Sequence, residues 1–145
     1  MRLETLGVVV PLDVHGEALA RAVAGTWGEC VVGPEGTASG RTAAPISVKV
    51  GGWGTADVSG EETSEVLRKL AIAVTRAAVA TQADNLVMLD AGALAARDSG
   101  AAAVLVATTG ADIASDLAAL RPDLVCLARS TVGISADCHV VPEIA

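Results

Sequence analysis

The run from Leu86 to Leu120 constrains the fold more than any other part of this 145-residue chain. It predicts a strand over 86–89, a small-residue segment over 91–96, a strand over 101–106 that is buried on both faces, and a helix that ends near Leu120. The Asp-Ser-Gly sequence before the second strand is a turn signal. A strand that passes through a glycine-containing loop into a helix is where α/β proteins hold phosphates, because the first N–H groups of a helix are free.

The rest of the chain also alternates strand and helix patterns. Strands are expected over 3–14, 46–50, 124–127, 131–134 and 139–141, and helices over 16–27 and from about 59 to 82. The glycine- and proline-rich segment 33–45 predicts a surface loop. We therefore expect an α/β fold in a single domain, with a mixed sheet and two or three helices. Residues 1–58 would form an N-terminal β-α-β part and residues 59–145 a helix followed by a P-loop-like core.

Composition and charge exclude several classes of function. The formal net charge is −7, which argues against a general nucleic-acid binder because such proteins present a basic face. Hydrophobic residues make up 52% of the chain, and this content argues against disorder. The apolar runs are too short to span a membrane, and no signal peptide is visible. The sequence thus predicts a soluble cytoplasmic protein that binds neither nucleic acid nor membrane.

Neither the cysteines nor the histidines form a recognisable catalytic or metal motif. Cys30, Cys126 and Cys138 are far apart, and none has the spacing of a metal site. His15 has no nucleophile or pair of carboxylates near it in the sequence, which favours a turn residue over a catalytic base. Trp27 recurs at helical spacing with apolar neighbours and is expected in the core.

Two segments carry a resemblance to a known family. Residues 87–94 are Val-Met-Leu-Asp-Ala-Gly-Ala-Leu, and residues 104–115 are Val-Leu-Val-Ala-Thr-Thr-Gly-Ala-Asp-Ile-Ala-Ser. Together they resemble the nucleotide-binding core of HPr kinase-like P-loop ATP-binding proteins of the actinobacterial type. Those proteins have a Met-Leu-His-Ala-Ala strand, a turn, a Val-Ala-Leu-Val strand and a Ser-Gly-x-Gly-Lys-Thr-Thr loop. The resemblance covers most of the chain and implies a P-loop fold.

The residues that carry the chemistry of that family are replaced. Its loop glycine falls on Asp112, its phosphate-binding lysine on Ile113, its magnesium-binding threonine on Ala114 and its first-strand histidine on Asp90. A carboxylate at ~4 Å from a phosphate would be repelled by about 4 kcal/mol at an effective dielectric of ~20. The apolar framework persists while these residues are lost together. This combination is typical of a degenerate, non-catalytic relative.

An alternative hypothesis keeps the loop as a nucleotide- or phosphate-binding site that uses ATP with Mg²⁺. Its contacts would come from residues that donate hydrogen bonds without neutralising charge: Thr108, Thr109, Gly110, Ala111 and Ser115. A plainer role for Asp112 is to favour the positive end of the helix dipole. An oxygen-only metal site of Asp90, Asp98 and Asp112 has no supporting spacing.

The leading hypothesis is a non-catalytic interaction or regulatory protein on a decayed HPr kinase-like P-loop scaffold, without catalytic residues, cofactor or metal. The resembled proteins continue beyond the point where this sequence ends, so an apolar surface is expected to remain uncovered. Homo-oligomerisation or docking on a full-length homologue would cover it.

Overall fold

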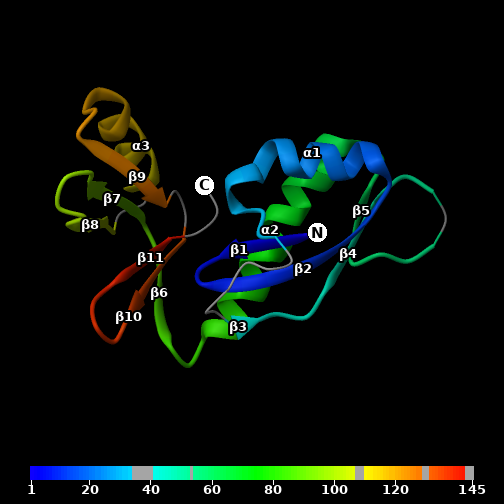
Figure 1. Ribbon diagram of the computed structural model, residues 1–145, viewed down its shortest axis with the longest axis horizontal. Coiled ribbons are helices and arrows are strands. Elements are labelled where there is room, and N and C mark those ends of the chain that lie inside the picture. The colour runs from blue at the N-terminus through cyan, green and yellow to red at the C-terminus, as the bar shows by residue number, and fades with distance from the viewer. Residues whose placement is uncertain (34–40, 53, 107–109, 129–130, 143–145) are drawn as a thin grey trace. The chain divides into compact units, whose positions relative to one another are not determined.

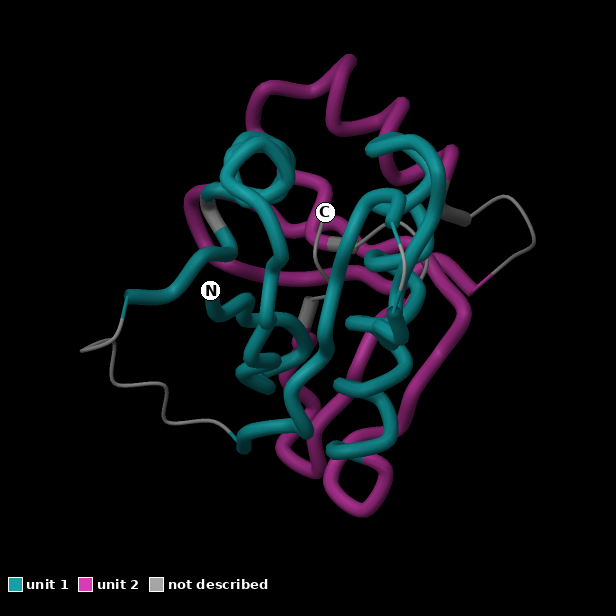
Figure 2. Tube along the Cα trace, turned by 90° about the vertical axis from the view of Figure 1, so that its right-hand side faces the viewer, with its two compact units in different colours: residues 1–82 teal, residues 83–145 magenta. Residues whose placement is uncertain are grey.

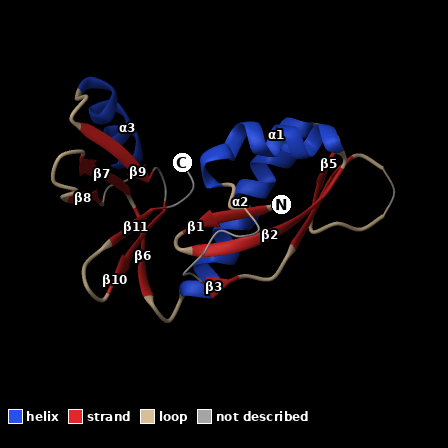
Figure 3. Ribbon diagram, viewed as in Figure 1, coloured by secondary structure: helices blue, strands red, loops and turns tan. Residues whose placement is uncertain are grey.

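The computed structural model (Figure 1) describes residues 1–33, 41–52, 54–106, 110–128 and 131–142. Strands and helices alternate along the chain (Figure 3), and the described residues contain three α-helices. Both parallel and antiparallel strand pairs occur, so the predicted α/β class with mixed pairing is confirmed. Contacts group the chain into two compact units, unit 1 over Met1–Gln82 and unit 2 over Ala83–Ala145 (Figure 2).

Unit 1 is built on a mixed sheet. Its elements are β1 (Arg2–Thr5), β2 (Val8–His15), α1 (Glu17–Trp27), a 3-10 turn (Gly28–Cys30), β3 (Arg41–Thr42), β4 (Ile46–Val50), β5 (Val58–Gly60) and α2 (Thr63–Gln82). The strand order is β1-β2-β4-β5, and β3 also pairs with β2. β1 and β2 are antiparallel, whereas β3 and β4 run parallel to β2 and β5 runs parallel to β4.

The hairpin between β1 and β2 closes through a two-residue turn. Leu6 has a φ of 51° and Gly7 a φ of 67°. Positive φ at both central positions is what a type I′ turn requires, and this turn matches the twist of the flanking strands. The stretch 3–14, for which the sequence allowed either one strand or a strand pair, is a strand pair.

Both helices of unit 1 bury one apolar stripe, as predicted. α1 buries Leu19, Val23 and Trp27, which confirms Trp27 as a core residue. α2 buries a stripe that recurs every four residues, Val66, Leu70, Val74 and Ala78. α2 begins at Thr63 instead of near residue 59, because residues 58–60 pair with β4 as β5. α2 belongs to unit 1 and contacts β2, β4 and β5.

Strand register separates polar from apolar residues at one end of this sheet. His15 lies beside Lys49, and Lys49 lies beside Ser59. The preceding register positions pair Val48 with Val58, and both valines are buried. Side chains alternate between faces along a strand, so the polar row and the valines lie on opposite faces of the sheet.

Unit 2 consists of two small antiparallel sheets and one helix. Its elements are β6 (Leu86–Asp90), β7 (Gly92–Ala96), β8 (Ala102–Leu105), α3 (Gly110–Leu120), β9 (Leu124–Ala128), β10 (Thr131–Ser135) and β11 (Val140–Pro142). The strand orders are β11-β10-β6 and β8-β7-β9. β8 and β9 are both antiparallel to β7, so α3 joins two mutually parallel strands that β7 separates.

The predicted burial of the strand over 101–106 is wrong. Ala102 and Ala103 are exposed in β8, and the Val106 side chain after it is 67% exposed. The central position is taken by β7, which the sequence indicated only as a small-residue segment. β7 has neighbours on both edges, and its residues Gly92–Ala95 are buried. β8 is an edge strand of this sheet.

The sheet of β11, β10 and β6 contributes to a small core of unit 2. Ala91, Ala93 and Val132 are buried at the centre of this core. Leu89, Val104, Leu127, Ile134 and Val140 are partly buried and pack against them. Among the described residues, no helix is both long and apolar enough to cross a membrane.

Candidate functional site

The loop proposed for phosphate binding meets the described structure at the start of α3. Thr108 and Thr109 lie outside the described residues. Gly110 is the first residue of α3 and Ala111 the second, and Ser115 lies half-buried about one turn further on. The order of strand, loop and helix is as predicted, with β8 before the loop and α3 after it. A nucleotide role for these residues stays a prediction.

Of the three replaced loop positions, Asp112 and Ile113 face solvent and Ala114 is fully buried. Asp112 is exposed in the first turn of α3, where a carboxylate is favoured by the helix dipole. The Ile113 side chain, at the position of the family's lysine, is 43% exposed. No group of three or more metal-ligating side chains occurs within the described ranges.

The other residues considered from the sequence do not form a reaction centre in the described part of the chain. The three cysteines form no disulfide with one another, and Cys138 is exposed whereas the other two are half-buried. His15 Nε2 lies 3.5 Å from Asp13 Oδ2, but their side chains are 59% and 72% exposed. Such an exposed pair contributes only about 0–1 kcal/mol to stability.

α3 leaves its largest apolar side chains partly exposed. Ile113, Leu117 and Leu120 are 43%, 38% and 77% exposed. Their spacing of four and three residues places them on one face of the helix. We call these three side chains the α3 stripe. A contiguous exposed apolar stripe on a helix is typical of a docking surface.

The buried face of α3 lies about 100° around the helix from the α3 stripe, because consecutive helical residues are offset by that angle. Ala114 is fully buried and Ala118 is half-buried, and α3 contacts β7 and β9. Ala93 of β7 packs in the small core with Ala91 and Val132, and Leu94, which alternates with it along the strand, is also buried. A small side chain such as Ala114 allows a helix to approach a sheet closely.

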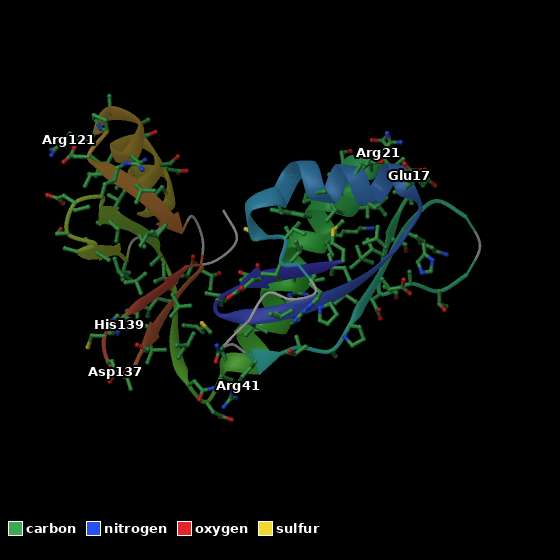
Figure 4. The ribbon with its side chains drawn as sticks, viewed as in Figure 1. Glu17, Arg21, Arg41, Arg121, Asp137 and His139 are labelled. Carbon is green, nitrogen blue, oxygen red and sulfur yellow. The ribbon has the colours of Figure 1, made fainter. Side chains whose placement is uncertain are left out.

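Charge is distributed unevenly around the α3 stripe. Asp112 and Asp116 are exposed in its N-terminal part, and Arg121 follows its last residue (Figure 4). Arg121 holds Asp123 through two hydrogen bonds, Nε to Oδ1 at 2.8 Å and an NH2 group to Oδ2 at 2.7 Å. These bonds lower the pKa of Asp123 and raise the pKa of Arg121. The α3 stripe is thus bordered by acidic groups at one end and a cation at the other.

Comparisons with known proteins identify no relative of this chain. No family model matches the sequence, and neither the curated proteins nor the solved structures provide a match. The site is therefore argued from its own geometry.

The sequence did not predict that the α3 stripe is exposed, because two sets of apolar residues recur at helical spacing in α3. Ile113, Leu117 and Leu120 recur at helical spacing, and so do Ala114 and Ala118. Hydrophobicity favours the first set as the buried face.

Proposed function

We propose that this protein is a non-catalytic interaction or regulatory protein, built on a decayed HPr kinase-like P-loop scaffold, that acts through the α3 stripe. The observation that carries the proposal is the outward face of α3, with Leu120 77% and Ile113 43% exposed. Ile113 stands where the resembled family has its phosphate-binding lysine. In the resembled family the residue at this position contacts the nucleotide, whereas in this chain it adds apolar surface. This difference supports a role in protein contact in place of nucleotide binding.

The partner that best fits the α3 stripe is a second copy of this chain, or a full-length homologue with the same helix. In a two-fold antiparallel pair of α3 helices, Ile113 of one copy lies opposite Leu120 of the other. The same register brings Asp112 near Arg121 of the second copy, so opposite charges meet at both ends.

The expected association is weak. Burial of an aliphatic side chain contributes about 1.5–3 kcal/mol when it is complete, and each side chain of the α3 stripe is already partly covered. Association itself costs about 4–15 kcal/mol. We therefore expect a dimer with a dissociation constant in the micromolar range or weaker, suited to reversible regulation.

Sedimentation equilibrium from low micromolar to submillimolar concentration tests the proposal. The wild-type mass should rise from one chain towards two, whereas Leu117→Lys and Leu120→Lys should hold the protein at one chain. Ile72→Lys is the matched control, because Ile72 is 44% exposed on α2 and lies outside the α3 stripe. A wild-type mass of one chain throughout, or equal behaviour of the Ile72 and Leu117 variants, would contradict the proposal.

The alternative function, nucleotide or phosphate binding through residues 107–115, is supported by the start of α3 directly after this loop. Calorimetric titration with ATP and GTP, with and without Mg²⁺, distinguishes nucleotide binding from the interaction function. The interaction proposal predicts no heat of binding at millimolar nucleotide. Micromolar binding that requires Mg²⁺ would favour the alternative instead.

A further inference from the structure

Unit 1 contains an open hollow where β4 and β5 end and α2 begins. Its volume is about 650 Å³, and its lining comes from these three elements and the link between the two strands. β4 and β5 are parallel, so their carboxyl ends meet at this edge of the sheet. The space outside the carboxyl ends of parallel strands is where open α/β sheets place their ligands.

Glycines shape the rim of the hollow. Gly51 and Gly52 have φ values of 62° and 78°, in the left-handed region that side-chain-bearing residues rarely adopt. The Gly51 N–H donates to the Gly60 carbonyl at 2.8 Å, which joins the ends of β4 and β5. The chain can therefore turn sharply at Gly51 and Gly52.

One wall of the hollow is a compensated pair of charges. Lys69 Nζ lies 2.7 Å from Glu65 Oε1 and donates to the Ser59 carbonyl at 3.0 Å. Glu65 Oε2 accepts the Glu61 N–H at 3.2 Å. The hydrogen bond from Lys69, followed by that from Glu61, lowers the pKa of Glu65, so this carboxylate stays charged and fixed. Lys69 and Glu65 thus cancel one another.

Two further charges line the hollow without such compensation. Lys49 is half-buried and its ammonium donates to the Gly54 carbonyl. Glu61 is exposed at the start of the helical segment. Within the described ranges, neither side chain has an oppositely charged group within 4.0 Å, and the two are not paired with each other. The hollow therefore offers a free cation and a free anion at separate points.

We propose that this hollow binds a small zwitterion, whose carboxylate or phosphate contacts Lys49 and whose ammonium contacts Glu61. Hydrogen bonds between charged partners are about twice as strong as neutral ones, so a ligand that satisfies both groups gains over one that satisfies either. The two lysines and two glutamates of the lining sum to zero charge, so the hollow offers a polyanion such as a nucleotide triphosphate no excess of cations. The site belongs to unit 1 and is independent of the α3 stripe.

Calorimetric titration of the full chain at low salt tests this proposal. The probes are glycine, β-alanine and γ-aminobutyrate, whose two charges lie progressively further apart, and O-phosphoethanolamine as the phosphate-bearing zwitterion. Acetate, inorganic phosphate and ethylamine supply one kind of charge each. We expect at least one zwitterion to bind at least about tenfold more tightly than every one-charge probe. Equal affinities, or no binding by any of the four zwitterions, would overturn the proposal.

Variants identify the residues involved. Lys49→Met and Glu61→Gln should each weaken binding of the best zwitterion at least about tenfold. Glu62→Gln is the matched control, because Glu62 is adjacent in sequence and does not line the hollow. An unchanged affinity in the Glu61 variant would overturn the assignment.

An exchange of the two charges separates ligand contact from a merely structural role. The double variant Lys49→Glu with Glu61→Lys should bind the zwitterion again, in the reversed orientation. Circular dichroism should first show that the double variant and the Lys49→Glu single variant are both folded. If the double variant then binds the zwitterion no more tightly than the single variant, the proposal is contradicted. Leu117→Lys should leave zwitterion binding unchanged, whether or not it alters the oligomeric state.

Discussion

Helices α2 and α3 both pack on a sheet, but they bury side chains of different size. α2 places Val66, Leu70 and Val74 in the core and leaves only Ile72 markedly exposed among its large apolar residues. α3 buries Ala114 and exposes Ile113 together with the two leucines of the α3 stripe. The amount of apolar surface in a helix therefore does not reveal which part of it faces inward.

The same contrast separates the two units. The core of unit 1 contains leucines and valines from four strands and both helices, whereas unit 2 buries chiefly alanines. An alanine removes less apolar area from water than a leucine, so each buried position contributes less free energy. We therefore expect unit 2 to open more readily than unit 1.

Substitution in the α2 core gives the largest expected effect. Leu70 is fully buried, and Leu70→Ala should reduce the free energy of unfolding by about 2–5 kcal/mol, because it removes buried methyl groups and leaves a cavity. Leu120→Ala on α3 should change it by no more than about 0.5 kcal/mol under conditions where the chain is monomeric. Urea unfolding followed by circular dichroism measures both. Similar losses would refute the contrast between the helices.

Enlargement of a buried alanine gives an intermediate effect. Ala114→Leu should destabilise by about 1–3 kcal/mol, because the closely packed layer between α3 and β7 cannot hold a larger side chain. Ala119→Leu places the same side chain at an exposed position of the same helix and is the control. Hydrogen exchange should show the loss of protection in amides of residues 83–145. A tolerated Ala114→Leu would mean that the core of unit 2 is loosely packed.

Acidification should reveal a smaller effect at the β4–β5 link. Asp57 accepts hydrogen bonds from the Ser47 hydroxyl at 2.6 Å and the Ser47 N–H at 2.8 Å. These bonds lower its pKa from the ordinary 3.8. The stability that they contribute is therefore present above about pH 3.8 and is lost as the pH falls through the lowered pKa.

Asp57→Asn should accordingly be less stable than wild type at neutral pH, and the difference should shrink on acidification below the ordinary pKa. Thermal unfolding as a function of pH checks this. Asp84→Asn, which removes the charge of an exposed carboxylate of unit 2, is the control for the loss of one negative charge. A pH-independent deficit in the Asp57 variant would show that its hydrogen bonds do not depend on ionisation.

The sequence correctly predicted the buried face of those elements whose apolar pattern is compatible with only one buried face. α1 and α2 each contain a single stripe of large side chains, and helical spacing placed Trp27 correctly. The alanine-rich segments gave no such answer, because alanine is compatible with either face and with either kind of element. The burial of β8 was therefore predicted wrongly, and the outward side of α3 was not foreseen.

The hollow of unit 1 depends on strand register, which local sequence does not contain. Lys49 and Ser59 lie side by side only because residues 51–57 return the chain so that β5 runs parallel to β4. Adjacent parallel strands are usually joined by a connection of a dozen or more residues. A link as short as this one therefore does not predict a parallel pair. The glycines indicated a turn, and they gave no direction for the strand that followed.

The hydrogen bond from Lys69 to the Ser59 carbonyl also affects how this protein behaves among its copies. β5 is the last strand of its sheet in the described residues, and the Gly60 carbonyl faces β4, so the neighbouring Ser59 carbonyl points outward. Another chain that extended the sheet at this edge would first have to displace a lysine. Open strand edges seed aggregation, and an ammonium group placed on the edge blocks that growth.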